Sequence, residues 1–152
     1  HEASDAIRDA LAEGKVVIAD RFASSNQIHQ GGKIADERER IDFLGWLDRM
    51  EHEVLNVPRP DAIIYLSVPV ETSLRLLTEK RAAKNQTLGD GVRDMVEEDR
   101  QYLERSHTTA SWLANRENNW HVVECMEEGG LRTPEAIHAD VRAIVEKLTA
   151  RV

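Results

Sequence analysis

Two spacings of apolar residues alternate along the 152-residue sequence, one typical of helices and one typical of buried strands. Apolar residues three or four positions apart predict helices, and short runs rich in β-branched residues predict strands. The predicted helices cover residues 3–11, 36–55, 70–82, 92–115 and 134–148. The predicted strands cover residues 15–19, 62–68 and 120–125.

The predicted strands are apolar at successive positions, which is typical of strands covered on both faces. Alternating strands and helices predict an α/β fold of three layers, with a parallel sheet between helices. We therefore expect one domain over residues 1–152. In such sheets ligands bind at the carboxyl ends of the strands.

Turn and capping residues support these boundaries. Gly14 stands where a glycine would end the first helix, and Thr133 and Pro134 are typical of the start of the last one. A turn is expected at Gly129 and Gly130. The polar stretch at about residues 83–92 predicts a mobile loop.

Composition narrows the functional classes. The sequence carries 28 acidic and 20 basic side chains, a net charge of −8, which argues against a general nucleic-acid binder. No apolar run approaches the roughly 20 residues of a membrane span, so no membrane partner is expected. The single cysteine, Cys125, fits a reducing, cytoplasmic compartment.

Asp20 and Arg21 directly follow the first predicted strand, where ligands of parallel sheets bind. An isolated pair of this kind is more often a capping aspartate and a solvated arginine. The neighbouring sequence favours function, because Asn26 and Gln30 lie four residues apart on one helical face. Their amides can pair with a nucleobase edge, while an arginine fork can bind a phosphate.

Other candidate motifs carry less information. Gly31-Gly32-Lys33 lacks the upstream glycine and the following Ser or Thr of a Walker A loop, so we interpret it as a flexible loop. The basic residues near the 83–92 loop have two interpretations. They are solvated charges, or they belong to a loop that closes over a polyphosphate. The six histidines show no zinc-ligand spacing.

The motif sequence resembles that of the thymidylate kinase family. Its hallmark is an Asp-Arg-aromatic step after a strand, then a serine-rich turn and Gln-Gly, and here it covers residues 20–31. The segment Pro58-Arg59-Pro60-Asp61, followed by a strand and Val68-Pro69, is similar to a second family segment. The resemblance extends over essentially the whole chain.

The resemblance implies a P-loop kinase-like fold, and a function in transferring the γ-phosphoryl group of ATP to dTMP with Mg²⁺. Arg21 would bind the acceptor phosphate, and Asp20 would help to organise Mg²⁺ and the phosphates. It also implies a homodimer. The remaining implied residues are Ser25, Asn26, His29 and Gln30 for dTMP, and Arg81 and Arg93 near the lid.

The family's Walker A loop would precede residue 1, so we expect the P-loop strand to be absent from this chain and the fragment alone to be inactive. Two alternatives stay open. One is a related nucleoside or nucleotide kinase with another base preference. The other is a non-catalytic, nucleotide-binding homologue.

Overall fold

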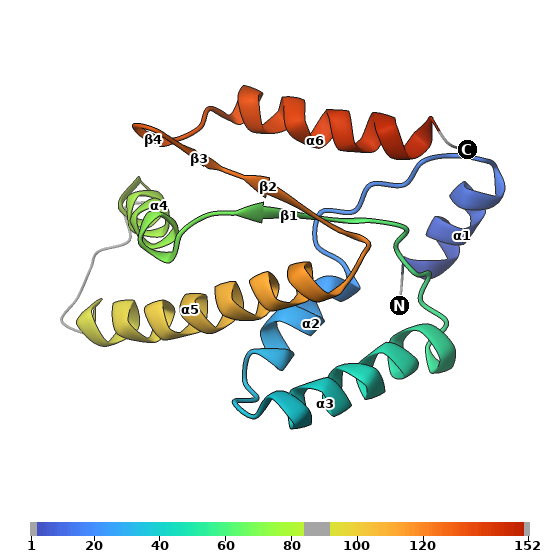
Figure 1. Ribbon diagram of the computed structural model, residues 1–152, viewed down its shortest axis with the longest axis horizontal. Helices are drawn as coiled ribbons and strands as arrows, with labels where there is room; N and C mark the ends of the chain where they lie inside the picture. Colours follow the sequence, from blue (N-terminus) through green and yellow to red (C-terminus); the bar gives the residue numbers. More distant parts are fainter. Residues whose placement is uncertain (1–2, 84–91, 151–152) are drawn as a thin grey trace.

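The computed structural model describes residues 3–83 and 92–150, with the predicted alternation of helices and strands (Figure 1). The predicted loop at residues 83–92 lies almost wholly outside the described residues. In chain order the elements are α1 (Ser4–Ala12), α2 (Ala23–Gly31), α3 (Glu37–Arg49), the π-helix η1 (Met50–Val54), β1 (Ile63–Ser67), α4 (Val70–Ala83), α5 (Val92–Arg116), β2 (Trp120–Glu124), β3 (Met126–Glu127), β4 (Gly130–Leu131) and α6 (Pro134–Thr149).

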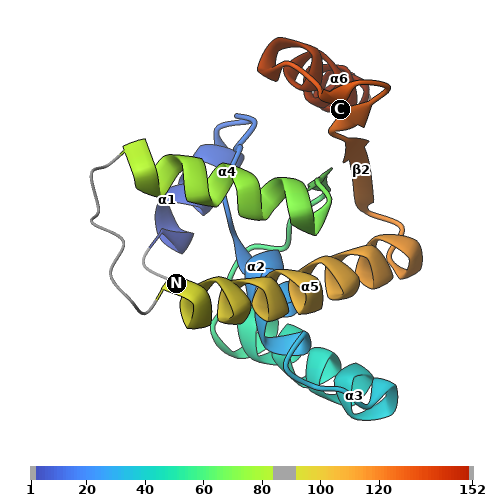
Figure 2. The ribbon, with the colours of Figure 1, turned by 90° about the vertical axis from the view of Figure 1, so that its left-hand side faces the viewer.

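A parallel pair of strands forms the centre of the molecule. β1 and β2 pair in register from Ile63 opposite Trp120 to Ser67 opposite Glu124. α6 lies on one side of this pair and α5 on the other, as both views show (Figures 1 and 2). The predicted layers are therefore confirmed, around a sheet that has two strands in the described part of the chain.

α5 is the helix on which most of the core is built. Ala110 and Leu113 of α5 are buried against Trp120 of β2. Ile28 of α2 and Leu44 of α3 pack on the same cluster. None of the helices described is long and apolar enough to cross a membrane.

The strand predicted at residues 15–19 is wrong. The segment is outside any strand and every residue in it is exposed, with Val16 at 61% and Ile18 at 78% of full exposure. An apolar run becomes a buried strand only when neighbouring strands pair with its edges. Among the described residues no strand pairs with this segment, and β1 pairs with β2.

The predicted caps are confirmed, and one long helix changes its form. Gly14 adopts a φ of +74°, and the Thr133 side chain accepts a hydrogen bond from the Ala136 amide at 3.2 Å. The helix expected at residues 36–55 is α-helical only to Arg49 and then widens into η1. Gly129 and Gly130 have φ values of +106° and +135° and lie at the expected turn, between β3 and β4.

The interpretation of Gly31 and Gly32 as a flexible loop is also wrong. Gly31 is the buried last residue of α2, and Gly32 caps that helix. A Cβ built on Gly32 would lie 3.0 Å from the carbonyl oxygen of Ile28 and 3.3 Å from that of Arg105 on α5. Both are backbone atoms, so the glycine allows the two helices to approach closely.

We expect Gly32→Ala to lower the free energy of unfolding by about 1–3 kcal/mol, because the added methyl group overpacks the contact between α2 and α5. Gly45→Ala in α3 is the matched control. A Cβ there meets only the end of the Arg49 side chain at 3.8 Å, so the variant should gain about 0.5–1 kcal/mol of helix stability. Urea unfolding measures both, and equal shifts would contradict the packing argument.

Candidate functional site

A strained turn presents Arg21 in front of α2. Arg21 has a φ of +65°, the left-handed region, between the extended segment that ends near Asp20 and the first residue of α2, Ala23. A residue with a side chain in this region costs about 1 kcal/mol or more, and such strain occurs most often at functional sites. The turn leaves the guanidinium exposed beside α2.

The Arg21 side chain is held by a hydrogen-bonded chain of three residues. Its Nη2 lies 3.0 Å from Nε2 of His29, and Nδ1 of His29 lies 2.8 Å from the Tyr102 hydroxyl. A guanidinium can only donate, so Nε2 must accept and His29 is neutral with its proton on Nδ1. That proton is donated to the hydroxyl oxygen of Tyr102, whose ring stacks on the imidazole at 5.2 Å.

The surroundings of His29 favour this neutral form. Partial burial lowers the pKa of His29, and the nearby cations Arg21 and Lys33 lower it further. Protonation would place a positive charge against Arg21 and remove the lone pair that its Nη2 binds. The cationic group that stays available to an anion is therefore Arg21.

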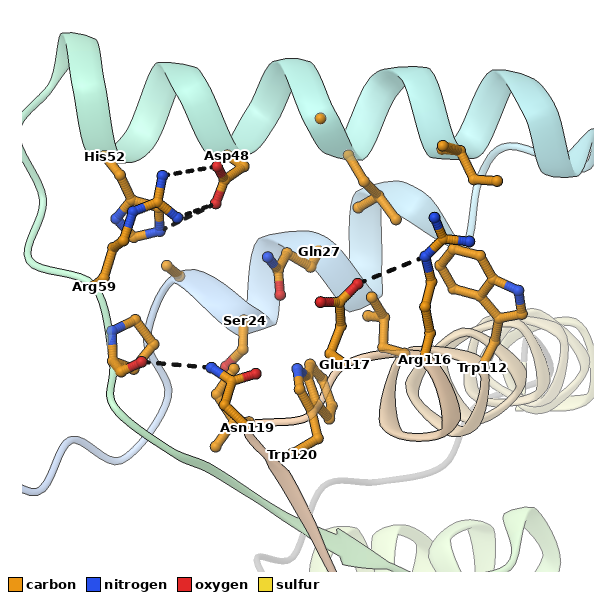
Figure 3. Close-up of a pocket in the computed structure, with 17 residues that line it drawn as sticks. Ser24, Gln27, Asp48, His52, Arg59, Trp112, Arg116, Glu117, Asn119 and Trp120 are labelled. Carbon is orange, nitrogen blue, oxygen red and sulfur yellow. Dashed lines mark hydrogen bonds and ion pairs between the residues drawn. The ribbon is translucent and has the colours of Figure 1, made fainter.

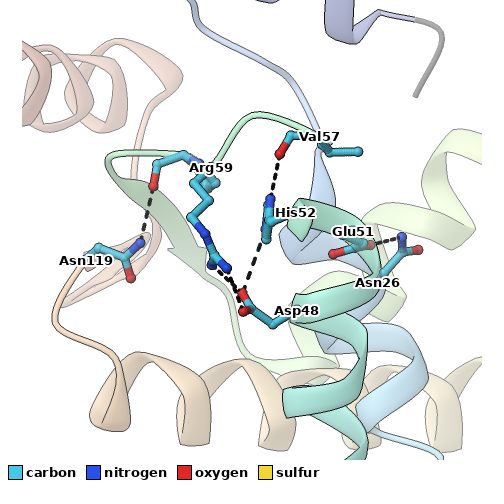
Figure 4. Close-up of polar contacts among 8 residues, drawn as sticks. Asn26, Asp48, Glu51, His52, Val57, Arg59 and Asn119 are labelled. Atoms are coloured by element: carbon cyan, nitrogen blue, oxygen red, sulfur yellow. Dashed lines mark hydrogen bonds and ion pairs between the residues drawn. The ribbon is translucent and has the colours of Figure 1, made fainter. Parts of the chain in front are cut away.

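Asn26 forms the other polar contact of the predicted site (Figure 4). Its Nδ2 donates to Oε1 of Glu51 at 2.7 Å. Glu51 is 7% exposed and lies on η1, so the contact ties α2 to the π-helix. Glu51 could not be predicted as a site residue, because its position in the sequence suits the polar face of a regular helix.

The remaining predicted residues are more scattered. Asp20 is exposed next to Arg21, and Ser25 is half-buried one turn before His29. Gln30 is exposed on α2, four residues after Asn26, and accepts a hydrogen bond from Lys33 at 2.9 Å. Arg81 and Arg93 lie in α4 and α5, but their side chains lie outside the described residues.

A pocket of about 470 Å³ lies on the other face of α2, between α3 and the end of α5 (Figure 3). It contains none of the predicted site residues, and it reaches Ile63 and Trp120, the first residues of the two parallel strands. Ligands of parallel sheets bind at the opposite, carboxyl ends. The position of the pocket therefore does not favour it as the candidate site, and we take Arg21, which the contacts with His29 orient, as the candidate instead.

The charged groups beside the pocket serve the structure. Arg59 donates to both carboxylate oxygens of Asp48, at 2.6 and 2.8 Å, and this lowers the pKa of Asp48 (Figure 4). His52 Nδ1 lies 2.8 Å from the carbonyl oxygen of Val57, to which it donates. These bonds fasten the segment before β1 to α3 and η1.

The described residues contain no group of three or more His, Cys, Asp or Glu side chains that could hold a metal ion. Asp20 offers one exposed carboxylate. Mg²⁺ is commonly bound by one or two carboxylates together with substrate phosphates and water, so this donor fits a magnesium ion that arrives with a nucleotide.

The architecture defines an α/β protein with an exposed arginine in the turn before α2. The thymidylate kinase family model matches residues 1–130, and the chain belongs to that family. The family has a P-loop kinase-like α/β fold, in agreement with the parallel strands between helices.

Curated relatives agree with this assignment. A thymidylate kinase of Thermosipho melanesiensis is 23% identical over 145 residues, covering 95% of this chain and 62% of the relative. One of Fervidobacterium nodosum is 29% identical over 140 residues, covering 89% and 58%. One of Pseudomonas syringae pv. tomato is 38% identical over 71 residues, covering 47% and 31%. The chain thus spans about 60% of the length of the first two relatives.

The lowered pKa of His29 predicts a pH-dependent stability. Below the ordinary histidine pKa of about 6.5, the unfolded chain binds a proton that the folded chain resists, so stability is lost as the pH falls. We expect His29→Gln to lose less stability than the wild type between pH 7.5 and pH 5.5 in urea unfolding. His138→Gln, at an exposed position of α6, should keep the wild-type dependence.

Proposed function

We propose that the protein containing this chain transfers the γ-phosphoryl group of ATP to dTMP, giving dTDP. The observation that carries the proposal is the orientation of Arg21 by neutral His29 beside α2. An exposed guanidinium carries five N–H donors, of which His29 engages one at Nη2, and such a group is suited to bidentate binding of a phosphate. The amino terminus of α2, which follows directly, adds the favourable end of a helix dipole.

Asp20 and Arg21 have complementary roles in this proposal. Arg21 binds the acceptor phosphate and places its oxygen for attack, and the exposed carboxylate of Asp20 binds Mg²⁺ directly or through water. Mg²⁺, when bound, neutralises charge on the phosphates. Phosphoryl transfer depends mainly on positioning and charge neutralisation, so these groups suffice without a covalent intermediate.

The other residues of α2 would recognise the nucleoside. Ser25 and His29 share one face of the helix with Asn26 on its flank, and these side chains would line the deoxyribose and the base. Gln30, which binds Lys33, would have to change partner to reach the base. Arg81 and Arg93 would supply positive charge to the transferring phosphoryl group.

We further propose that the ATP phosphates are bound by residues outside this chain. The 152 residues contain no Gly-x-x-x-x-Gly-Lys-Ser/Thr sequence, which is the usual cradle for these phosphates. The chain then supplies the acceptor half of the site and by itself does not catalyse the transfer.

Arg21→Ala in the complete protein is expected to lower kcat/KM for dTMP by about 100-fold or more, because two hydrogen bonds to a charged phosphate are lost. Arg38→Ala on the exposed face of α3 is the control and should leave the kinetics unchanged. Unchanged dTMP kinetics in Arg21→Ala would contradict the proposal.

Arg21→Gly separates the side chain from its strained backbone. We expect Arg21→Gly to lose as much activity as Arg21→Ala. Its free energy of unfolding should be about 1 kcal/mol higher than that of Arg21→Ala, because glycine adopts a φ of +65° without strain. Steady-state kinetics and urea unfolding of the two variants measure this difference. Equal stabilities would show that the turn carries no strain.

The two alternatives predict different results from the same protein. Comparing dTMP, dUMP and thymidine as acceptors identifies a kinase of another base preference. Calorimetry with dTMP and ATP identifies a non-catalytic homologue, which would bind dTMP but not ATP.

A further inference from the structure

Glu51 is a buried carboxylate with one oxygen paired and the other unpaired. Oε1 accepts from Nδ2 of Asn26 at 2.7 Å (Figure 4), while Oε2 is buried and has no hydrogen-bond partner among the residues that the structure describes. Buried polar atoms are nearly always paired, and each exception requires an explanation. A carboxylate kept in this state costs stability, which is consistent with a role other than folding.

The backbone around Glu51 is also unusual. The helix leaves the α-form at Met50, and the amide of Leu55 bonds to the carbonyl oxygen of Met50, five residues back, at 2.9 Å. π-Helical turns of this kind are rare and occur frequently at functional sites. The amide of Val57 then bonds to the carbonyl oxygen of Glu51 at 2.8 Å, which fixes the end of the turn.

The pairing determines which way the Asn26 amide faces. A carboxylate can only accept hydrogen bonds, so the NH₂ group of Asn26 must turn toward Glu51. The carbonyl oxygen Oδ1 is then on the other side of the amide, and the Asn26 side chain is exposed. Asn26 and His29 lie three residues apart on α2, so their side chains are neighbours on the helix surface. The Asn26 acceptor is therefore near the pair formed by Arg21 and His29.

We propose that Glu51 is a positioning residue that sets base selectivity through Asn26. The fixed carbonyl oxygen of Asn26 accepts a hydrogen bond from a base that carries an N–H at its pairing edge, such as the imide of thymine or uracil. Cytosine has a lone pair at the corresponding ring nitrogen and is disfavoured. This inference rests on the proposed function, because it takes Arg21 to hold the phosphate of the same nucleotide.

A purely structural reading makes a different prediction. If Glu51 only ties η1 to α2, its replacement changes stability and affects all nucleotides equally. If it orients Asn26, its replacement changes the ratio of affinities for two bases. The ratio of the dissociation constants of dCMP and dTMP therefore distinguishes the two roles, and thermal unfolding measured alongside reports the structural contribution.

The test is calorimetry of dTMP and dCMP with the complete protein and its Glu51→Gln variant. A glutamine at this position can donate or accept, so the Asn26 amide is free to turn either way. We expect the preference of the wild type for dTMP to fall by about tenfold, the effect of one hydrogen bond in a binding site. Glu53→Gln, at an exposed position of the same π-helix, is the matched control and should retain the wild-type ratio.

Asn26→Ala supplies the second arm, and combining it with Glu51→Gln removes the buried carboxylate that Asn26→Ala alone would leave unpaired. It should lower the ratio by a similar factor, and adding Glu51→Gln to it should change the ratio no further. A wild-type ratio retained in Glu51→Gln, or in Asn26→Ala, would overturn the inference. Wild-type protein that binds no dTMP would overturn the proposed function and this inference together.

Discussion

The close approach of α2 to α5 is the contact on which the candidate site depends. Gly31 and Gly32 allow the end of α2 to lie against Thr109 and the backbone of Arg105. With the helices at this distance, His29 reaches Tyr102 and Ser106, two residues of α5 on successive turns. The imidazole is then fixed at one nitrogen by α5, and its other nitrogen is directed to Arg21. The packing of two glycines against α5 thus determines where the cation of the site lies.

The sequence predicts features that depend on neighbouring residues, but not those that depend on contacts between distant segments, such as the contact of α2 with α5. The elements themselves followed from local signals: helical spacing in α5, Thr133 with Pro134 at the start of α6, and glycines at the β3–β4 turn. The strand predicted at residues 15–19 was wrong because burial of a strand depends on the strands beside it. A run of apolar residues contains no information about those strands. The interpretation of Gly31 and Gly32 as a loop was wrong for a related reason. In a single sequence, a glycine that allows two helices to pack closely cannot be distinguished from a glycine in a loop.

The candidate site likewise has features that follow from the local sequence and features that depend on the folded backbone. The motif at residues 20–31 proposed Arg21, Asn26 and His29 as site residues, and the structure places Asn26 and His29 on α2 and Arg21 in the turn before it. It did not predict the hydrogen bond between Arg21 and His29, which requires the left-handed φ of Arg21. Nor did it reveal Glu51, because the π-helix places a side chain on a face that 3.6-residue periodicity assigns elsewhere. Long-range polar partners depend on backbone irregularities, and these leave little trace in a single sequence.

The exposed segment at residues 15–19 has a consequence for handling the chain in solution. Three successive β-branched residues at positions 16–18 are exposed and belong to no strand of the described structure, so another extended chain can add to them. The charges of Lys15 and Asp20 at its two ends act against such stacking, as charged residues beside aggregation-prone strands generally do. The colloidal stability of these 152 residues is therefore controlled by a short segment with a charge at each end, and salt that screens those charges will favour self-association.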